Sequence, residues 1–405
     1  MYKISDYLMV TVEEAKKLLC ENIQHTGVIE VNILDSLNCV LASTIISPID
    51  LPSFDQSSMD GYAINSGNDL DRKEFEVIGE IKAGDDSNFI LEAGKAVRIF
   101  TGAKIPLHTD SIVVQEKVTE ENGTLFLQEK IKIADCIRKK GTQIKCGQIA
   151  LEVGSIMNPA SIGFVASLGI GKVNIFSKPK VSIIVTGNEI VSLDDELTNA
   201  KVFESNSYTL TSALNQMDIR VKSTHLTEDD LEVLKQKINT CLINADIVLI
   251  TGGISVGKYD FAYEAMLACG VETIFYKVLQ KPGMPIFAGK FRRKLIFALP
   301  GNPASALVCF YQYVYPSIKQ LQGFQNIYLP TAKCKSHKEI NKKTGKAHFI
   351  RATLSDGFVT ELDGQDSNML RSFAQANGFI YLGKETEKVL PGEEVEFHFL
   401  PFNTI

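Results

Sequence analysis

The chain has 405 residues, of which 45% are hydrophobic, and a formal net charge of −6. This length and apolar content predict a globular protein with more than one domain and exclude a wholly disordered chain. The acidic net charge argues against non-specific nucleic-acid binding, although local patches can still recruit anionic ligands.

Cysteine and hydropathy patterns bear on the cellular compartment. The eight cysteines form no C-x-x-C pair and have no flanking histidines at zinc spacing, so we interpret them as reduced thiols. No apolar stretch approaches the length of a membrane span, and the N-terminus lacks the apolar segment of a secretory signal. We therefore expect a cytoplasmic enzyme with no membrane or nucleic-acid partner.

The N-terminal part begins with a predicted helix over residues 10–25, where Thr11 and Glu14 have the spacing of a capping box. Short strands and turns follow from Phe75 to Ile144, as in a β domain. A second helix begins at Asn158 and Pro159, since asparagine can cap and proline suits the first helical turn. We predict an N-terminal linker domain of residues 1–47 and 145–178, and an inserted β domain of residues 48–144.

Two positions of the inserted domain are candidate functional residues. Asp60 ends a polar segment at the turn dipeptide Asp60-Gly61, so it is either a turn acid or a carboxylate delivered to a site elsewhere. Thr101 follows a strand, directly before Gly102 and close to Lys104. A β-turn with an incidental threonine is an equally good interpretation.

Residues 179–326 alternate strands with helices, which predicts a doubly wound parallel sheet. Three strands end in loops of small residues: TGNE at 186–189, TGGISVG at 251–257 and PGNP at 300–303. Because parallel strands share an edge at their C-terminal ends, these loops should line one crevice and present amides to an anion. The candidate binding residues are Thr186, Gly187, Gly252, Gly253, Ser255, Gly257, Pro300, Gly301, Asn302 and Pro303.

The same edge should gather charged side chains. Glu189, Asp229 and Asp260 are candidate acids, and Lys277 and Lys281 are candidate cations. The alternative interpretation is that Asp260 only caps a helix and that the other charges are solvated faces. Carboxylates beside phosphate-type loops suggest Mg²⁺, which binds through few carboxylates together with ligand oxygens.

Residues 327–405 return to short strands and fit a small β-barrel. Lysines cluster in this part, and two interpretations stay open for them: the solvated face of a hairpin or a basic rim for an anionic ligand. The residues concerned are Lys333, Lys335, Lys338, Lys342, Lys343 and Lys346, together with Arg351.

Six ordered motifs together resemble one family, the MoeA-type molybdopterin molybdenumtransferases, which also form the E domain of gephyrin. They are SSMDGYAI at 57–64, RIFTGA at 98–103, TGNE at 186–189, TGGISVGKYD at 251–260, KPGMP at 281–285 and LPGNPAS at 299–305. The resemblance spans nearly the whole chain. It implies a multidomain fold: a doubly wound α/β molybdopterin-binding domain with an N-terminal linker region, an inserted β domain and a C-terminal small β-barrel.

The resemblance also implies an elongated homodimer, in which the β domain of one subunit faces the α/β crevice of the other. The acids of the family correspond to Asp60, Glu189, Asp229 and Asp260, and its metal ligands to the last three. Thr101, Lys277 and Lys281 join the catalytic set, and Pro300, Pro303 and Arg351 join the binding set. Family members often have an aspartate where this chain has Gln143, so no carboxylate role is carried over there.

The implied reaction converts adenylyl-molybdopterin and molybdate into molybdenum cofactor and AMP, with Mg²⁺ as cofactor. The implied partners are molybdopterin adenylyltransferase and downstream molybdoenzyme chaperones. Two alternatives are weighed: the adenylyltransferase itself and a gephyrin-like scaffold. The domains that flank the α/β part argue against the first, and the lack of a further fused domain argues against the second.

Overall fold

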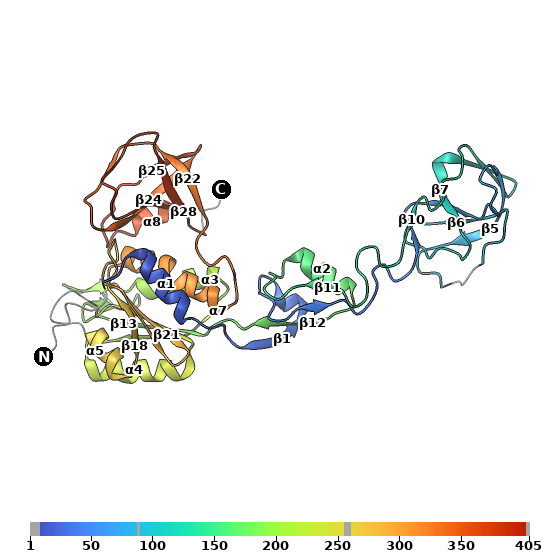
Figure 1. Cartoon of the computed structure of the whole chain (residues 1–405). Coiled ribbons are helices and arrows are strands. Elements are labelled where there is room, and N and C mark those ends of the chain that lie inside the picture. Colours follow the sequence, from blue (N-terminus) through green and yellow to red (C-terminus); the bar gives the residue numbers. More distant parts are fainter. Residues whose placement is uncertain (1–8, 87–89, 255–260, 402–405) are drawn as a thin grey trace. The chain divides into compact units, whose positions relative to one another are not determined.

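The computed structural model describes residues 9–86, 90–254 and 261–401. Two compact units account for the chain: residues 1–29 with 176–405, and residues 30–175 (Figure 1). Ser255, Gly257 and Asp260, which the sequence nominates as functional, lie outside the described residues. The four domain boundaries expected from the sequence stay a prediction.

The first unit contains a six-stranded sheet, and the doubly wound fold is confirmed. Four neighbouring strands run parallel, whereas β20 is antiparallel to β21 and to β18. The sheet is therefore mixed at one side, because a hairpin links its last two strands along the chain. In spatial order the strands are β16 (Val221–Thr227), β13 (Val181–Thr186), β17 (Ile247–Thr251), β21 (Lys294–Leu299), β20 (Phe287–Phe291) and β18 (Glu272–Tyr276).

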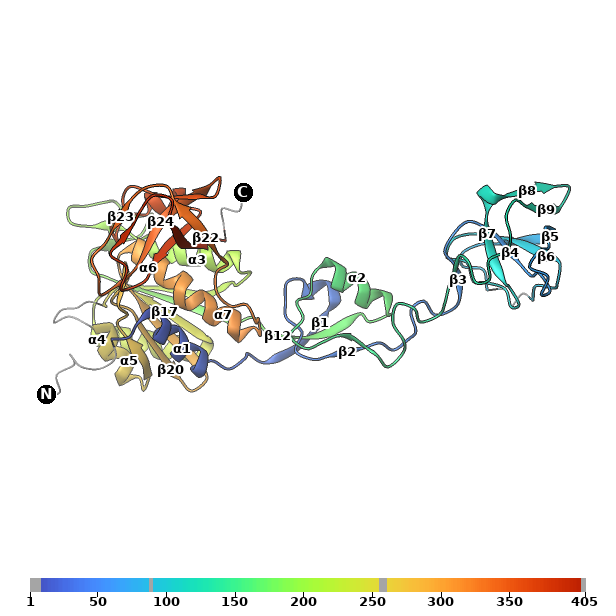
Figure 2. The ribbon, with the colours of Figure 1, turned by 45° about the horizontal axis from the view of Figure 1, so that its top comes forward.

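Helices cover both faces of this sheet (Figure 2). Successive residues of β13 show the consequence: Ile183 packs in one core cluster and Ile184 in the other. A strand buried on both faces must be apolar throughout, as VSIIV is. One face carries α1 (Val12–Asn22), α3 (Asn206–Gln216), α6 (Pro303–Cys309) and α7 (Tyr315–Leu321), and the other carries α4 (Leu231–Asn244) and α5 (Phe261–Ala268).

Local signals explain where several helices begin. The side chains of Thr11 and Glu14 each accept a hydrogen bond from the other residue's amide, so the predicted capping box is present on α1. The helical run from 303 to 321 is continuous but has a π-helical segment, Phe310–Val314, just before Pro316. Proline has no amide hydrogen and disrupts regular α-helical bonding, which accounts for the altered turn.

A small closed barrel follows the α/β part. Its strands pair in a ring, since β24 contacts both β25 and β26, and β19 of the α/β part adds to β24 in parallel register. The elements are β19 (Gln280–Lys281), β22 (Thr331–Ser336), β23 (Ile340–Asn341), β24 (Ala347–Ser355), β25 (Phe358–Glu361), α8 (Arg371–Gln375), β26 (Gly378–Leu382), β27 (Lys388–Val389) and β28 (Glu394–Phe399). A short parallel pair, β14 (Ile190–Val191) with β15 (Val202–Phe203), precedes α3.

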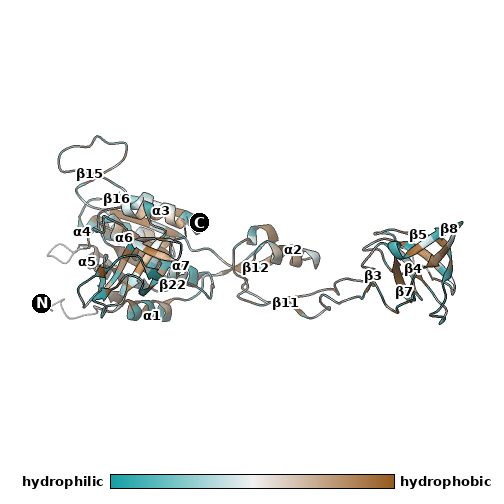
Figure 3. Cartoon of the chain, turned by 90° about the horizontal axis from the view of Figure 1, so that it is seen from above, coloured by the Kyte–Doolittle hydropathy of each residue, from teal (hydrophilic) through white to brown (hydrophobic). Residues whose placement is uncertain are grey.

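The second unit holds a six-stranded β sheet and a small helical layer. The sheet has the order β7-β4-β6-β5-β9-β8, and its strands carry both hydrophobic and hydrophilic residues (Figure 3). Its strands are β4 (Gly61–Ile64), β5 (Glu74–Ile81), β6 (Lys95–Ile99), β7 (Ser111–Val114), β8 (Val118–Glu121) and β9 (Thr124–Leu127). The other elements are β2 (Ile45–Ile46), β3 (Gln56–Ser57), β10 (Ile137–Arg138), β11 (Ile149–Leu151) and α2 (Pro159–Ser167). The β1 (Val28–Asn32) and β12 (Lys172–Phe176) pair contains the boundary between the units.

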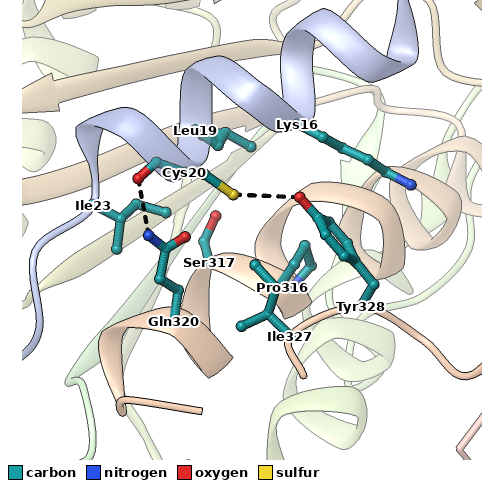
Figure 4. A pocket seen from close by; sticks show the side chains of 9 residues that line it. All are labelled: Lys16, Leu19, Cys20, Ile23, Pro316, Ser317, Gln320, Ile327 and Tyr328. Carbon is teal, nitrogen blue, oxygen red and sulfur yellow. Dashed lines mark hydrogen bonds between the residues drawn. The ribbon is translucent and has the colours of Figure 1, made fainter. Parts of the chain in front are cut away.

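The N-terminal helix is fixed to the first unit by polar and ring contacts (Figure 4). Cys20 Sγ lies 3.3 Å from the Tyr328 hydroxyl, Gln320 donates to the Cys20 carbonyl, and the Lys16 ammonium lies 5.0 Å from the Tyr328 ring centre. The pocket between these side chains has a volume of about 10 Å³, room for one water at most. The contacts therefore anchor α1, and the pocket is too small for a substrate. No described helix is long and apolar enough to cross a membrane.

Candidate active site

The loops predicted to share a crevice do lie together at one edge of the α/β sheet. The Thr186 hydroxyl, at the end of β13, donates to the Asp229 carboxylate at 2.5 Å. The Asp229 amide in turn donates to the Asn188 side chain at 3.2 Å. These bonds tie the loop after β13 to the loop after β16, so Asp229 is held in place by its neighbours.

The loop after β17 is pressed against the loop after β13. Gly252 has a φ of +91°, and a Cβ placed on it would lie 1.9 Å from the Thr186 carbonyl oxygen. A Cβ on Gly253 would lie 3.0 Å from the Thr186 methyl group. Because no L side chain fits the first position, glycine is required there for the loops to approach.

Asn206, at the first turn of α3, ties a third loop to these. Its amide nitrogen donates to the Thr251 hydroxyl at 2.6 Å and to the Gly301 carbonyl at 2.8 Å. The residue is only 7% exposed, and its amide oxygen has no hydrogen-bond partner in the described structure. The Gly301 carbonyl only accepts, which fixes the amide orientation. The local sequence around Asn206 gives no sign of these long-range contacts.

A crevice of about 610 Å³ opens between these loops and the β14–β15 pair. This volume lies within the range of roughly 300–1,000 Å³ typical of small-molecule sites. Glu189 lines it, together with Asn206, Pro300, Gly301, Asn302 and Pro303. Of the predicted set, Thr186, Gly187, Gly252 and Gly253 lie in the adjoining loops.

Acidic groups, not basic ones, dominate the lining of the crevice. Glu189 and Glu204 are its charged residues, and the described lining contains no lysine or arginine. The Glu204 carboxylate accepts from the Ser207 amide at 2.7 Å and from its hydroxyl at 2.5 Å, so it neutralises the N-terminus of α3. An anionic ligand would therefore need cations from outside the described lining.

Glu189 and Asp229 could supply oxygen ligands to a metal ion from two neighbouring loops. Within the described residues no group of three or more histidine, cysteine, aspartate or glutamate side chains could hold a metal. Hard carboxylate oxygens suit Mg²⁺, which commonly takes one or two carboxylates and completes its shell with water and phosphate. The donor set fits a magnesium ion that binds together with a phosphate-bearing ligand.

The two predicted lysines lie at different places in the first unit. Lys277 follows the C-terminal end of β18, with its ammonium 4.7 Å from the Tyr276 ring centre. Lys281 lies in β19, which pairs with β24 of the barrel. Neither side chain lines the crevice.

Asp60 and Thr101 meet in the second unit, which the sequence did not indicate by itself. The Asp60 carboxylate accepts from the Thr101 hydroxyl at 2.7 Å and from its amide at 2.8 Å. These two bonds, the hydroxyl first, hold the pKa of Asp60 below its ordinary value. The pair presents an ionised carboxylate at the end of β6. Gln143, in the same unit, donates its backbone amide to the Leu51 carbonyl.

Arg351 is buried, in contrast to the predicted acids Asp60 and Glu189, which are exposed. It is 1% exposed, and its guanidinium donates to the carbonyls of Gly364, Asp366 and Met369. The segment it holds carries Ser367, which accepts a hydrogen bond from Asn302, and Asn368, which lines the crevice. Asn302 thus lies at the N-cap of α6 without capping it, because its side chain bonds Ser367 instead.

This combination defines a class of protein: a multidomain protein with a ligand crevice at the edge of a doubly wound sheet. Three family profiles match the chain in order. They are described as the MoeA N-terminal region (domain I and II) at residues 10–169, a probable molybdopterin binding domain at 182–320 and the MoeA C-terminal region (domain IV) at 333–400.

Full-length relatives agree with these profiles. The chain is 33% identical to the molybdopterin molybdenumtransferase of Haemophilus influenzae, covering 98% of this chain and 99% of that protein. It is 32% identical to the Staphylococcus epidermidis protein of the same name, covering 96% and 94%. A crystal structure of a molybdopterin biosynthesis MoeA protein from Pyrococcus horikoshii superposes with a TM-score of 0.83 at 27% identity, covering 97% of this chain and all of that one. The chain belongs to the MoeA family of molybdopterin molybdenumtransferases, as its motifs predicted.

Proposed function

We propose that this protein inserts molybdenum into adenylylated molybdopterin, a late step of molybdenum cofactor biosynthesis. The reaction takes adenylyl-molybdopterin and molybdate, breaks the pyrophosphate link, releases AMP and leaves molybdenum on the dithiolene sulfurs. The observation that carries the proposal is the crevice of about 610 Å³ between the loops at 186–189, 251–254 and 300–303 in a member of this family. Its size fits an extended small molecule.

The residues suggest catalysis by positioning and electrostatics. Substrate, molybdate and AMP are all anions, so their mutual repulsion must be offset. Lys277 and Lys281 are the cations we assign to this task, and Asp60, Thr101 and Asp260 complete the catalytic set. Glu189, Asp229 and Asp260 would hold Mg²⁺, which when bound would neutralise phosphate charge.

The remaining predicted residues act in binding. Small residues of the three loops leave backbone amides free to approach phosphate, and Asn302 and Pro303 begin α6 at the crevice. The guanidinium of Arg351 is buried, so Arg351 would act on the site through the segment 364–369 that it holds. A ligand would touch Arg351 only after residues 364–369 move.

We also propose that the protein works as a cytoplasmic homodimer. Large apolar side chains of the second unit are exposed, among them Leu34, Ile46 and Ile149, and a contact with another copy would cover them. The Asp60–Thr101 pair of one subunit would then complete the crevice of its partner. Molybdopterin adenylyltransferase and molybdoenzyme chaperones would supply the substrate and receive the product.

The test is an assay of the purified protein with adenylyl-molybdopterin, Mg²⁺ and molybdate. We expect AMP release together with a metal-loaded cofactor, both dependent on molybdate and reduced by chelation of Mg²⁺. Glu189→Gln should lower turnover strongly, whereas Glu74→Gln, an exposed acid in β5, should not. ATP consumption on molybdopterin without turnover of the adenylylated form would instead identify an adenylyltransferase.

A further inference from the structure

The barrel carries a second hollow, larger than the crevice, which the proposed reaction does not account for. It has a volume of about 1,280 Å³, above the range of roughly 300–1,000 Å³ usual for small-molecule sites. Its wall is formed by the hairpin loop 341–346, the strand pair β19 and β24, and residues 387–388. The hollow lies wholly within the first unit.

Positive charge dominates this wall. Five lysines line the hollow against one acid, Glu387. Lys388 is paired with Glu339 at 2.9 Å, but no carboxylate among the described residues lies within ion-pair distance of Lys281, Lys343 or Lys346. The Lys342 ammonium is held by the carbonyls of Lys343, Lys346 and Lys384, so its charge has a fixed place. The sequence left open whether Lys342, Lys343 and Lys346 belong to a solvated face, and their place in the lining of this hollow favours a binding surface.

The hydrogen-bonding groups of the wall indicate what kind of anion fits. The described lining contains no arginine, so a compact phosphate would find no planar guanidinium fork there. What the hollow offers is a row of separate ammonium groups on flexible stems, which suits charges distributed along a chain.

We infer that this hollow, between β19, the 341–346 hairpin and residues 387–388, is a docking surface for an acidic segment of a partner protein. The commitment rests on its size, on the excess of five lysines over one acid in its lining and on the separation of their ammonium groups. It does not depend on the proposed reaction. Lys281 belongs both to the lining of the hollow and to the proposed catalytic set. A segment bound in the hollow would therefore also change the surroundings of Lys281.

The test measures binding of a fluorescent oligoglutamate peptide to the full-length protein by anisotropy. We expect saturable binding that weakens as salt rises, because exposed lysines are screened. Lys343→Glu combined with Lys346→Glu should weaken it by about tenfold or more. Lys222→Glu combined with Lys338→Glu is the matched control, since it changes the net charge equally with two exposed lysines outside the hollow. Equal loss in both double variants would overturn the assignment.

A second measurement reads the hollow directly. His348 pairs in register with Lys281, and burial, then Lys342, Lys281 and Lys346, lowers the pKa of its ring to about 4. A bound acidic peptide offsets these lysines, so the ring pKa should rise, as followed by NMR of the His348 ring protons. Inorganic triphosphate or an oligonucleotide binding more tightly than the peptide would overturn the peptide assignment. An unchanged His348 titration in saturated protein would overturn the site.

Discussion

Asn206 is the side chain that connects the loops of the crevice. One amide nitrogen bridges Thr251, the last residue of β17, to Gly301, after β21, while the residue itself begins α3. A buried amide oxygen without a hydrogen-bond partner lowers the stability of the fold, so its presence calls for an explanation. The explanation here is that the Asn206 amide holds two phosphate-type loops at a fixed separation. The small side chains of these loops could not hold that separation by themselves.

We predict that Asn206→Ala destabilises the protein by about 1–3 kcal/mol, because the Gly301 carbonyl and the Thr251 hydroxyl lose a buried donor. Turnover of adenylyl-molybdopterin should fall more than the KM rises if the loops are mispositioned. Urea unfolding and steady-state kinetics measure the two effects. Asn215→Ala, on the exposed side of the same helix, is the control and should change neither. Wild-type values for Asn206→Ala would remove the bridge from the site.

In the Asp60–Thr101 pair, hydrogen bonds orient an exposed carboxylate and favour its ionised form. Asp60 is exposed, and its carboxylate is ionised and oriented by two bonds from a single residue 41 positions away. Its pKa is lowered by hydrogen bonding, so the ionised form persists as the pH falls. A turn acid that bonds only its own neighbours would not need Thr101.

At the scale of elements, the sequence predicted more of the fold than of the site. Capping signals at Thr11 and Asn158 act within three residues, and buried strands such as VSIIV are continuous apolar runs, so both were visible. The reversed direction of β20 was not, because an apolar run carries no sign of its direction. Asn302 and Asn206 have the local pattern of caps but bond residues far along the chain. Arg351 looked like a basic rim residue, and its burial depends on a segment 13 to 18 residues later.

The close approach of the β13 and β17 loops at Gly252 can be tested by substitution. Gly252→Ala places a methyl group against the Thr186 carbonyl oxygen in a left-handed conformation, so the β13 and β17 loops must separate. We predict destabilisation of more than about 2 kcal/mol and loss of turnover. Gly163→Ala is the matched control, because Gly163 is exposed in α2 with open space around its Cα. It should stabilise the protein by about 0.5–1 kcal/mol. Thermal unfolding of both variants decides the point.

The barrel should be sensitive to acid through a buried histidine. Burial, followed by Lys16, lowers the pKa of His398 to about 4, although Glu396 acts in the opposite direction. The unfolded state, with an ordinary histidine pKa near 6.5, then binds the extra proton, so stability falls as pH drops from about 6.5 to about 4. His398→Phe should reduce this pH dependence of urea unfolding and leave the part that His348 contributes, whereas His337→Phe at an exposed position should not change it. Equal slopes for wild type and His398→Phe would contradict the expectation.

At the scale of the whole molecule, the predicted functional residues fall into two groups on two separate units. Glu189 and Asp229 belong to the crevice of the first unit, while Asp60 and Thr101 belong to the second. The crevice lining as described also lacks basic groups, although its proposed ligands are anions. A site assembled from two copies of the chain would join both groups, and this can be separated from a site within one copy by mixing inactive variants.

We predict that Asp60→Ala and Glu189→Ala proteins, each folded and nearly inactive alone, regain activity when their subunits are exchanged. A dimer with one subunit of each kind has one composite crevice with both lesions and one with neither. Random exchange makes half of the dimers mixed, so activity should recover to about a quarter of wild type. Mass spectrometry of isotope-labelled subunits verifies the exchange. If exchange is complete and the mixture stays inactive, Asp60 and Glu189 do not meet across a dimer, and Asp60 acts within its own chain or outside the site.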